Sequence, residues 1–563
     1  MLVDARKLSV DEVIETEVCI IGAGPAGITL AREFAHADFR VALLESGGLE
    51  FNQNTQLLAE GESVGHDFGK LETHRCRQFG GTANWWEIKI PHHPIGVRYV
   101  PLDKIDFEQR DWLPYSGWPF NKSHLDPFYE RAQSVCQIGP FAYDAAAWSD
   151  AGTPQLPLNG ERVTTTMFQF GPRTAFTKDG LNEINQASNI TTYLNANVLE
   201  IETNATARTI TRVRVACLEG NEFWVCAKVF ILATGAMENA QLLLLSNKQQ
   251  QTGLGNHNDL VGRFFMDHPF VDGGLLLPAD PQIFKQTALY DLRLVNHVAV
   301  MGKLTLTEAV MHHEQLLNIS ALLFPRPKSY QSLAANSLEI LRKNFRDREL
   351  PQDFSKHFSN VIVGLDYILP AVYRRLTKQQ NFFPNLGSGG WSYLQANERR
   401  FVTFEVLYFT EQAPNPNNRV MLSTQRDRLG RRQVLLHNRV WSDMEISSIK
   451  RAQAIFTAEI ARAGLGQLQT KRDGELPRMQ GPGAHHHMGT TRMHNDPKQG
   501  VVDENCQVHG ISNLFIAGSS VFPTGGFANP TLTIIALSIR LADHVKIVMA
   551  QQKPLASIGD KRQ

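Results

Sequence analysis

The chain has 563 residues, of which 42% are hydrophobic and 20% are charged, as in an ordinary soluble globular protein. A chain of this length is too long for one simple core, so two large lobes are expected. Its 56 basic and 56 acidic residues cancel, which argues against nucleic acid or another broadly anionic partner.

The cysteines and the N-terminal residues argue against further classes of protein. The six cysteines are scattered without a C-x-x-C pair, so neither a zinc site nor a disulfide framework is indicated, and no metal is expected. Residues 1–7 lack the apolar core of a signal peptide, and no apolar run of about 18 residues follows. We therefore expect a cytoplasmic protein that does not span a membrane, with export on a signal-bearing partner subunit left open.

The first predicted element is a short apolar strand, residues 17–21, which leads directly into a G-x-G-x-x-G run. In such a run Gly22 permits the tight turn, Gly24 lets a pyrophosphate reach the backbone, and Gly27 lets a helix pack against the strand. The motif alone is weak evidence, so its surroundings decide whether it binds a dinucleotide.

Those surroundings agree with a βαβ unit. Pro25 suits the first position of a helix, and the apolar stripe of residues 28–34 continues that helix. The next strand, residues 40–44, ends at Glu45, where a carboxylate would accept the adenosine ribose hydroxyls. This context favours a dinucleotide site over a glycine-rich loop without a ligand.

Next in the chain, residues 79–86 read Phe-Gly-Gly-Thr-Ala-Asn-Trp-Trp. Paired glycines beside aromatic residues suit a loop that presses against a flat ring, although an aromatic-rich surface turn is the alternative. Residues 101–189 are expected to link the lobes and to contain a helix near residues 125–132.

A second strand–turn–helix unit follows. Residues 224–235 predict a buried strand that ends in Ala-Thr-Gly, and residues 239–245 predict the helix after it. Doubly wound sheets collect strands from distant parts of a chain, so the first lobe is expected to be discontinuous.

From about residue 271 to 479 the pattern changes to alternating strands, such as residues 401–409, and predicts a sheet with one buried face. The exception is 338–383, which mixes basic and apolar residues. A solvated helical insertion or lid over the cleft is favoured there, because acidic residues dilute the charge, and contact with a membrane or a protein partner is the alternative.

Two runs near the C-terminus carry candidate chemistry. Residues 485–493 join three histidines to a Met-Gly-Thr turn, and Asn529-Pro530 predicts a helix start with Asn529 as N-cap and Pro530 at the first position. The free N–H groups of such a start would face an anion. A triple-histidine metal site is disfavoured, because adjacent residues of an extended run point to alternate sides and no nearby carboxylate or cysteine completes the ligands.

Together the G-x-G-x-x-G run with Glu45, the 79–86 loop, the Ala-Thr-Gly turn and the C-terminal block resemble the glucose-methanol-choline (GMC) oxidoreductases. The likeness is greatest to the bacterial branch related to pyranose oxidase and sugar 3-dehydrogenases. It implies an α/β fold with a discontinuous Rossmann-like FAD-binding domain and a substrate-binding domain built on an antiparallel sheet with helices. The expected boundaries are 1–100, 190–270 and 480–563 for the FAD-binding domain, 101–189 for a lobe-linking and substrate-domain segment, and 271–479 for the substrate-binding domain with its insertion 338–383.

The resemblance assigns the catalytic base to His486 and the second catalytic position to Asn529, whereas His485 and His487 fall outside the motif spacing. It places Glu411 and Gln412 near the cleft opposite His486 as substrate-binding residues. Several relatives carry a histidine bonded covalently to the flavin where this chain has Trp85, so FAD is expected to be non-covalent. The positions that match FAD contacts are Gly22, Gly24, Pro25, Ala26, Gly27, Glu45, Ser46, Gly80, Gly81, Thr82, Asn84, Trp85, Val198, Ala233, Thr234, Gly235, Gly518, Ser519, Pro530 and Thr531.

The function implied is FAD-dependent oxidation of a CH–OH group of a sugar, glycoside or polyol, by proton abstraction and hydride transfer to flavin N5, with oxygen, a quinone or another carrier as electron acceptor. The residues support this independently, because a neutral imidazole near pH 7 can take the hydroxyl proton and an amide can donate to the developing alkoxide. The alternative is a flavoprotein subunit of an electron-transfer complex that docks a cytochrome-like or membrane partner through 338–383. No oligomeric state is predicted.

Overall fold

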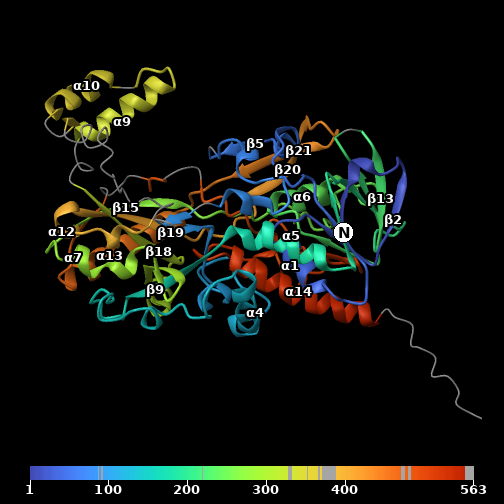
Figure 1. Ribbon diagram of the computed structural model, residues 1–563, viewed down its shortest axis with the longest axis horizontal. Helices are drawn as coiled ribbons and strands as arrows, with labels where there is room; N and C mark the ends of the chain where they lie inside the picture. The colour runs from blue at the N-terminus through green and yellow to red at the C-terminus, as the bar shows by residue number, and fades with distance from the viewer. Residues whose placement is uncertain are drawn as a thin grey trace, which may run out of the picture.

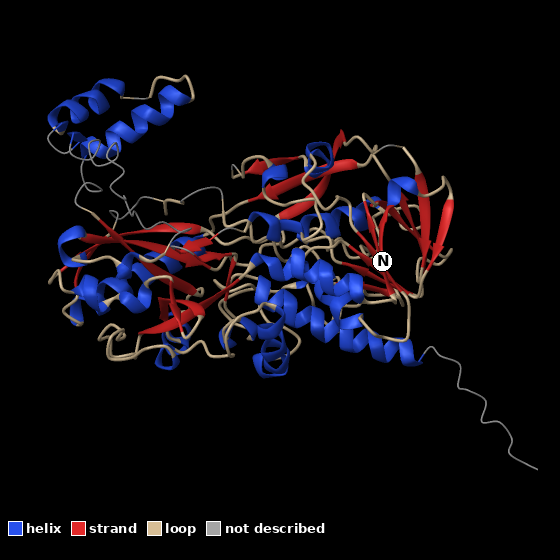
Figure 2. Ribbon diagram, in the orientation of Figure 1, coloured by secondary structure: helices blue, strands red, loops and turns tan. Residues whose placement is uncertain are grey.

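The computed structural model describes all residues except 67, 87, 91, 92, 219, 328–332, 352, 366, 367, 370–388, 471–475, 480–482 and 552–563 (Figure 1). Two lobes lie side by side: one contains the N-terminus and mixes helices with a parallel sheet, and the other is built on a large antiparallel sheet (Figure 2). Within the described part of the chain, every helix is too short or too polar to cross a membrane.

A six-stranded parallel sheet forms the centre of the first lobe, and its strands come from three separated parts of the chain. The lobe is therefore discontinuous, as the sequence predicts. In spatial order the strands are β1 (Leu2–Asp4), β10 (Ile190–Leu194), β4 (Val41–Leu44), β3 (Val18–Ile21), β14 (Val229–Leu232) and β23 (Leu514–Ile516).

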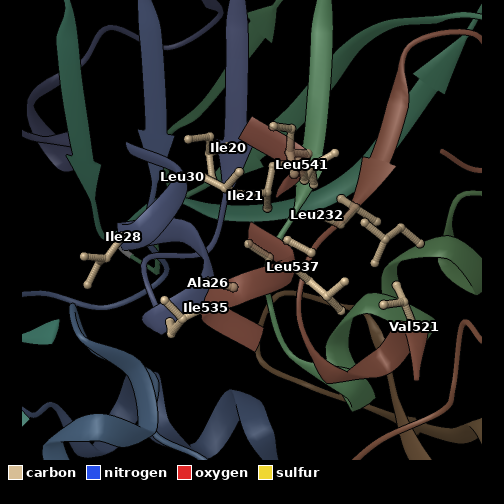
Figure 3. Close-up of a cluster of buried hydrophobic side chains, with 14 of the residues drawn as sticks. Ile20, Ile21, Ala26, Ile28, Leu30, Leu232, Val521, Ile535, Leu537 and Leu541 are labelled. Atoms are coloured by element: carbon tan, nitrogen blue, oxygen red, sulfur yellow. The ribbon is translucent and has the colours of Figure 1, made fainter. Parts of the chain in front are cut away.

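Apolar side chains of this sheet and its helices form one core. Figure 3 shows Ile20 and Ile21 of β3 and Leu232 of β14 packed with Leu537 and Leu541 of the C-terminal helix. Strands such as β3 and β4 are buried on both faces, which explains their continuous apolar sequences. The larger helices of this lobe are α1 (Pro25–Phe34), α4 (Lys122–Val135), α5 (Lys178–Gln186), α6 (Ala236–Leu245) and α14 (Thr531–Gln551).

Smaller sheets flank the parallel sheet. One has the order β11 (Asn197–Thr203), β12 (Ile210–Ala216), β13 (Glu222–Cys226) and β2 (Glu12–Glu15). Another has the order β20 (Arg419–Arg426), β21 (Arg432–Asn438) and β5 (Gly61–Gly65), and β6 (Ile88–Ile90) pairs with β7 (His93–Ile95). Because β5 pairs with β21, the polypeptide between residues 419 and 438 joins a strand of the N-terminal segment rather than the large antiparallel sheet.

The second lobe is organised by an antiparallel sheet. Its path is β22 (Gly466–Gln469), β15 (Phe270–Pro278), β19 (Thr403–Thr410), β18 (Ile319–Arg326), β17 (Val298–Leu306), β9 (Val163–Gly171) and β8 (Val97–Tyr99), with β16 (Arg293–Val295) beside β17. The helices of this lobe include α7 (Ile283–Gln286), α8 (Glu308–Glu314), α12 (Asn397–Arg400) and α13 (Asp443–Arg462).

The prediction of one buried face was wrong for the centre of this sheet. Every residue of β19 is buried. On one face Tyr408 stacks on Phe456 of α13 at 5.5 Å, and on the other face Phe409 contacts Phe270 and the guanidinium of Arg98. The second face is covered because it meets the cavity between the lobes, which a single strand's pattern does not reveal.

Residues 101–189 do more than link the lobes. Their strand β9 pairs with β17 in the antiparallel sheet, whereas α4 packs against α14 and α5 packs against α1 in the other lobe. The segment thus contributes structure to both lobes.

The insertion 338–383 is described only in part. Helices α9 (Leu333–Arg346) and α10 (Phe354–Val363) pack on each other and stand away from the body of the antiparallel lobe (Figure 1). Residues 370–383 lie outside the described part of the chain, together with the basic positions predicted there.

Candidate active site

A cavity of about 480 Å³ runs from the G-x-G-x-x-G loop to the C-terminal histidine run. Both ends of the chain and the antiparallel sheet contribute to its wall. The sequence-predicted residues that line it are Gly22, Gly24, Pro25, Ala26, Glu45, Ser46, Gly81, Thr82, Trp85, Val198, Ala233, Thr234, Gly235, His486, Gly518, Ser519, Asn529, Pro530 and Thr531. Gly27, Gly80, Asn84, Glu411 and Gln412 lie outside the wall.

The glycine-rich loop has the conformation that its sequence predicts. Gly22 adopts φ of 104°, which favours glycine, and its N–H donates to the Leu44 carbonyl at 2.8 Å. Helix α1 begins at Pro25, and Gly27 lies against the Gly22 carbonyl so closely that a Cβ would overlap it. Gly27 therefore holds the helix against β3 and lies outside the cavity wall.

The cavity wall fits a dinucleotide cofactor. A Cβ placed on Gly24, Gly235 or Gly518 would meet no atom within 4 Å, so these three stretches of backbone are open toward the cavity. Helices α1, α6 and α14 all begin at this wall, so their free N–H groups and the positive ends of their dipoles favour an anion in the cavity. Glu45 also lines the wall, and its two oxygens accept the N–H groups of Ala23 and Gly47.

The Phe-Gly-Gly-Thr loop presses against this wall. Gly80 donates its N–H to the Ala23 carbonyl at 2.8 Å, and Gly81 approaches Gly24 closely. Asn84 donates to the carbonyls of Phe79 and Gly81, both at 2.9 Å, and so closes the turn. Gly80 and Asn84 therefore shape the loop, while Gly81, Thr82 and Trp85 face the cavity.

Backbone contacts hold the histidine run in place. Met488 pairs with Met266 through two backbone hydrogen bonds, and Gly489 adopts φ of 84° where a Cβ would overlap the Phe264 carbonyl. The carboxylate of Asp267 accepts the backbone N–H groups of His485 and His486 at 3.1 and 2.8 Å. The Gly-Thr turn thus fixes the imidazole of His486 at the end of the cavity.

His486 and Asn529 meet at this end. The amide nitrogen Nδ2 of Asn529 lies 3.1 Å from Nε2 of His486. Both residues line the cavity, and no Asn529 bond to a described backbone N–H is found. The predicted N-cap role of Asn529 was therefore wrong: α14 begins at Thr531, the Pro530 carbonyl accepts the first helical hydrogen bond from Ile534, and the Asn529 side chain turns into the cavity instead.

The sequence did not identify three further residues of this end. Arg98 of β8 donates its Nε–H to Oδ1 of Asn529 at 2.9 Å, and its guanidinium lies over the rings of Phe168 and Phe409 at 4.6 and 4.1 Å. Nδ1 of His268 lies 2.9 Å from Nδ1 of His486. Asp267 accepts the backbone N–H of His268 as well as those of the histidine run. The local signal for Arg98 is a lone charge within an apolar strand; His268 and Asp267 have no comparable signal.

Burial keeps both histidines neutral. It lowers the pKa of His486 well below its usual value, with smaller contributions from His268 and Arg98, and it lowers the pKa of His268 to about 4. Burial also raises the pKa of Asp267 to about 6, against the backbone hydrogen bonds that lower it. A neutral imidazole with an available lone pair is the state that a general base requires.

The other two histidines of the run also line the cavity, but their rings contact different side chains. His485 stacks on His74 with a centroid distance of 4.0 Å, and His487 is buried beside Phe68 and Phe265. Within the described part of the chain, His486 is the histidine of the run that is hydrogen-bonded to Asn529 and His268. Among the described residues, no group of histidine, cysteine or carboxylate side chains is arranged to hold a metal ion.

The prediction that Glu411 and Gln412 face the substrate was wrong. Glu411 is fully buried and forms a two-point ion pair with Arg110, at 2.5 and 2.9 Å. Gln412 accepts the backbone N–H of Asp267 at 2.9 Å and so supports the cavity wall from behind. A carboxylate at a strand end looks solvated in the sequence, but here a distant arginine neutralises it in the interior.

Two parts of the chain match described protein families. Residues 16–261 match the family described as pyridine nucleotide-disulphide oxidoreductase, and residues 414–538 match the family described as GMC oxidoreductase. The fructose dehydrogenase large subunit of Gluconobacter japonicus is 28% identical over 357 residues, which are 62% of this chain and 53% of that subunit. The match thus spans about half the length of that relative.

Two further comparisons cover nearly the whole chain. A 2-methyl-1,2-propanediol dehydrogenase of Mycolicibacterium austroafricanum is 21% identical over 591 aligned positions, covering 94% of this chain and 95% of that protein. The structure of formate oxidase from Aspergillus oryzae RIB40 has a TM-score of 0.51 at 17% identity, covering 97% of this chain and 100% of that one, and shows a shared fold. These findings confirm the family resemblance and the fold class that the motifs predict.

Proposed function

Because the chain is a GMC oxidoreductase whose cofactor is FAD, we propose that it oxidises a CH–OH group of a sugar, glycoside or polyol, with His486 as base and Asn529 as hydrogen-bond donor. The observation that carries the proposal is the 3.1 Å contact between Asn529 Nδ2 and His486 Nε2 at the end of the cofactor cavity. The names of the relatives support the substrate class, since one acts on fructose and another on a small diol.

The amide–imidazole contact marks the position of the reacting hydroxyl. A hydroxyl oxygen there accepts a hydrogen bond from Asn529 Nδ2 and donates its own proton to Nε2 of His486. As that proton moves to the imidazole, negative charge grows on the oxygen and the bond from Asn529 strengthens. Bound FAD would supply the acceptor for the hydride that leaves the same carbon.

The chain's own residues would hold FAD without a covalent bond. The open backbones of Gly24 and Gly518 and the start of α14 at Thr531 would face the pyrophosphate and the flavin end, and Glu45 the ribose. Trp85 lines the cavity at the position where several relatives carry a linking histidine, and an indole has no nitrogen suited to that bond.

The test is to mix the FAD-loaded protein with a panel of candidate substrates in the absence of oxygen and to measure the loss of flavin absorbance. Sugars, glycosides and polyols are expected to reduce the flavin, and long-chain aliphatic alcohols are expected to be poor substrates, because the relatives that support the substrate class are named for a sugar and a small diol. A clear preference for the aliphatic alcohols would refute the proposed substrate class. Repeating the assay with oxygen, a quinone and a one-electron dye identifies the electron acceptor.

A second candidate function is electron delivery within a complex, with the paired helices α9 and α10 as the docking element. These helices expose large apolar side chains, including Phe345 at 56%, Phe358 at 51% and Val363 at 81%. Large exposed apolar groups on a protruding element are typical of surfaces that meet a partner. The Gluconobacter relative is itself named a large subunit.

Two measurements separate the candidates. The purified chain alone should turn over sugars with an artificial acceptor if it is a self-sufficient enzyme. A variant with Phe345→Ser and Phe358→Ser should leave that turnover unchanged, and it should lose delivery to a membrane or cytochrome fraction only if the helices dock a partner.

A further inference from the structure

Four side chains form one unbranched line of hydrogen bonds, in the order Arg98, Asn529, His486 and His268. We propose that Arg98 and His268 are positioning residues that together fix which ring nitrogen of His486 carries the proton, so that Nε2 stays unprotonated and can take the substrate proton. This inference rests on the proposed function, in which His486 is the base. It extends that function to two residues outside the family's catalytic pair.

Arg98 sets the direction of the line, because a guanidinium can only donate hydrogen bonds. Its Nε–H lies 2.9 Å from the side-chain amide of Asn529, so the atom that faces Arg98 must be the amide oxygen. The amide nitrogen then faces His486 and donates to Nε2 at 3.1 Å. Nε2 must therefore carry a lone pair, and the orientation of the amide follows from the chemistry of the arginine.

Arg98 is itself held firmly. Its guanidinium lies over the rings of Phe168 on β9 and Phe409 on β19 of the antiparallel sheet. Among the described residues no carboxylate pairs with it, so Asn529 is its polar partner in the structure. If Asn529 turned its oxygen toward His486, its NH₂ group would face the Nε–H of Arg98, and two donors would meet.

His268 receives the other end of the line. A neutral His486 with a lone pair on Nε2 carries its proton on Nδ1, which lies 2.9 Å from Nδ1 of His268. His268 must then accept this bond and carry its own proton on Nε2. That nitrogen is buried with no hydrogen-bond partner among the described side chains, beside the backbone of Gly525 and Gly526.

Asp267 fixes the spacing of the two rings. Its Oδ1 accepts the backbone N–H of His268 at 2.7 Å and that of His486 at 2.8 Å, so one carboxylate oxygen ties both histidines together. The rings meet edge to face, with a centroid distance of 5.2 Å. The Nδ1–Nδ1 contact is therefore set by the backbone as well as by the side chains.

The two positioning residues act on the base in opposite directions. When His486 takes the substrate proton, its Nδ1–H bond to His268 becomes charge-assisted and stabilises the imidazolium. A positive charge on His268 would oppose the same protonation, but burial lowers the pKa of His268 to about 4, so the neutral ring is the state that accepts this bond. The positive charge of Arg98 opposes the protonation of His486. The other titratable or charged groups near the pair are Asp267, His485, His487 and Glu411.

Matched substitutions test each residue. His268→Asn keeps an acceptor oxygen near the position of Nδ1, whereas His268→Leu has a similar shape without an acceptor. Arg98→Lys keeps a positive donor, whereas Arg98→Met removes it. Flavin reduction is measured by anaerobic stopped flow. It should be ~10-fold or more slower in His268→Leu than in His268→Asn, and in Arg98→Met than in Arg98→Lys. This is part of the ~10²–10⁴ rate factor that a general base typically contributes.

The pH dependence of flavin reduction distinguishes a positioning role from a non-specific loss of structure. Flavin reduction requires unprotonated His486, so its rate falls as pH falls through the pKa of that residue. Arg98→Met removes the opposing charge, so the fall in rate at low pH (the acid limb) should begin at a higher pH. In Arg98→Lys the acid limb should stay where it is in the unaltered protein. His268→Leu removes the bond that stabilises the imidazolium, so its acid limb should not move to higher pH.

The tautomer can also be read without substrate. Long-range ¹H–¹⁵N spectra of the FAD-loaded, histidine-labelled protein, with His486→Gln to identify the signals, should show His486 protonated on Nδ1 alone. Arg98→Met should give a mixture of tautomers. A resting His486 protonated on Nε2, or equal rates and equal acid limbs within each matched pair, would overturn the proposal. A protein that oxidises no sugar would refute the proposed function alone, because the tautomer is measured independently of any substrate.

Discussion

The assignment of the base to His486 makes the sharpest prediction. His486→Ala removes the only histidine whose ring nitrogen contacts the Asn529 amide among the described residues. General-base catalysis typically raises a reaction rate by a factor of ~10²–10⁴, so the rate of flavin reduction should fall by roughly a hundredfold or more. A hundredfold loss corresponds to about 2.7 kcal/mol of transition-state stabilisation. FAD should remain bound, because the cofactor end of the cavity is built by other segments.

The neighbouring histidines provide matched controls. His485 stacks on His74, and His487 is buried against Phe68 and Phe265, so neither ring reaches Asn529. His485→Ala and His487→Ala should therefore slow flavin reduction much less than His486→Ala does. His487→Ala should show its effect on the denaturation midpoint, because it leaves a cavity among aromatic rings.

Anaerobic stopped-flow reduction of the single variants and of His486→Ala combined with Asn529→Ala decides the matter. Residues that act as a unit are not additive, so the double variant should resemble the worse single variant. Asn529→Ala should slow reduction without loosening α14, since the side chain makes no cap. Near-normal reduction in His486→Ala, or a greater loss in His487→Ala, would show that the base is another histidine.

Three further predictions concern the cofactor and the fold. FAD should be released by acid precipitation, and yellow colour kept in the denatured pellet would contradict the inference drawn from Trp85. Gly27→Ala should greatly reduce the flavin content of the purified protein, because the added Cβ overlaps the Gly22 carbonyl, and full flavin content would refute that packing argument. Glu411→Ala should lower stability by ~3–5 kcal/mol in urea denaturation, because it leaves the charge of Arg110 buried and unpaired. A variant with normal stability but an altered sugar preference would restore Glu411 to the substrate site.

The conformation of the glycine-rich loop and its place at the cavity could be predicted because the signals are local. The turn at Gly22, the helix start at Pro25 and the carboxylate of Glu45 lie within a single βαβ unit, where each residue type has a direct geometric reason. The start of α14 was predicted almost as well, with an error of one residue at Pro530. That small shift reversed the interpretation of Asn529, from a helix cap to a cavity residue.

The remainder of the site could not be predicted because it depends on contacts between distant segments. Arg98 and Asn529 are 431 residues apart in the chain, and His268 and His486 are 218 apart. Glu411 was misplaced for the same reason, since its partner Arg110 is 301 residues away. A sequence pattern reports the face of one element, and only the packed fold reports which elements face each other.

The distribution of the site over the two lobes has a consequence for catalysis. His486 and Asn529 belong to the C-terminal part of the FAD-binding lobe, whereas Arg98 lies on β8 of the antiparallel sheet and His268 lies just before β15. The hydrogen-bond line that positions the base therefore crosses the boundary between the lobes. Because a displacement of about 1 Å is enough to cost large factors in rate, we expect changes in the docking of the antiparallel sheet against the other lobe to slow a reaction that uses His486 as base.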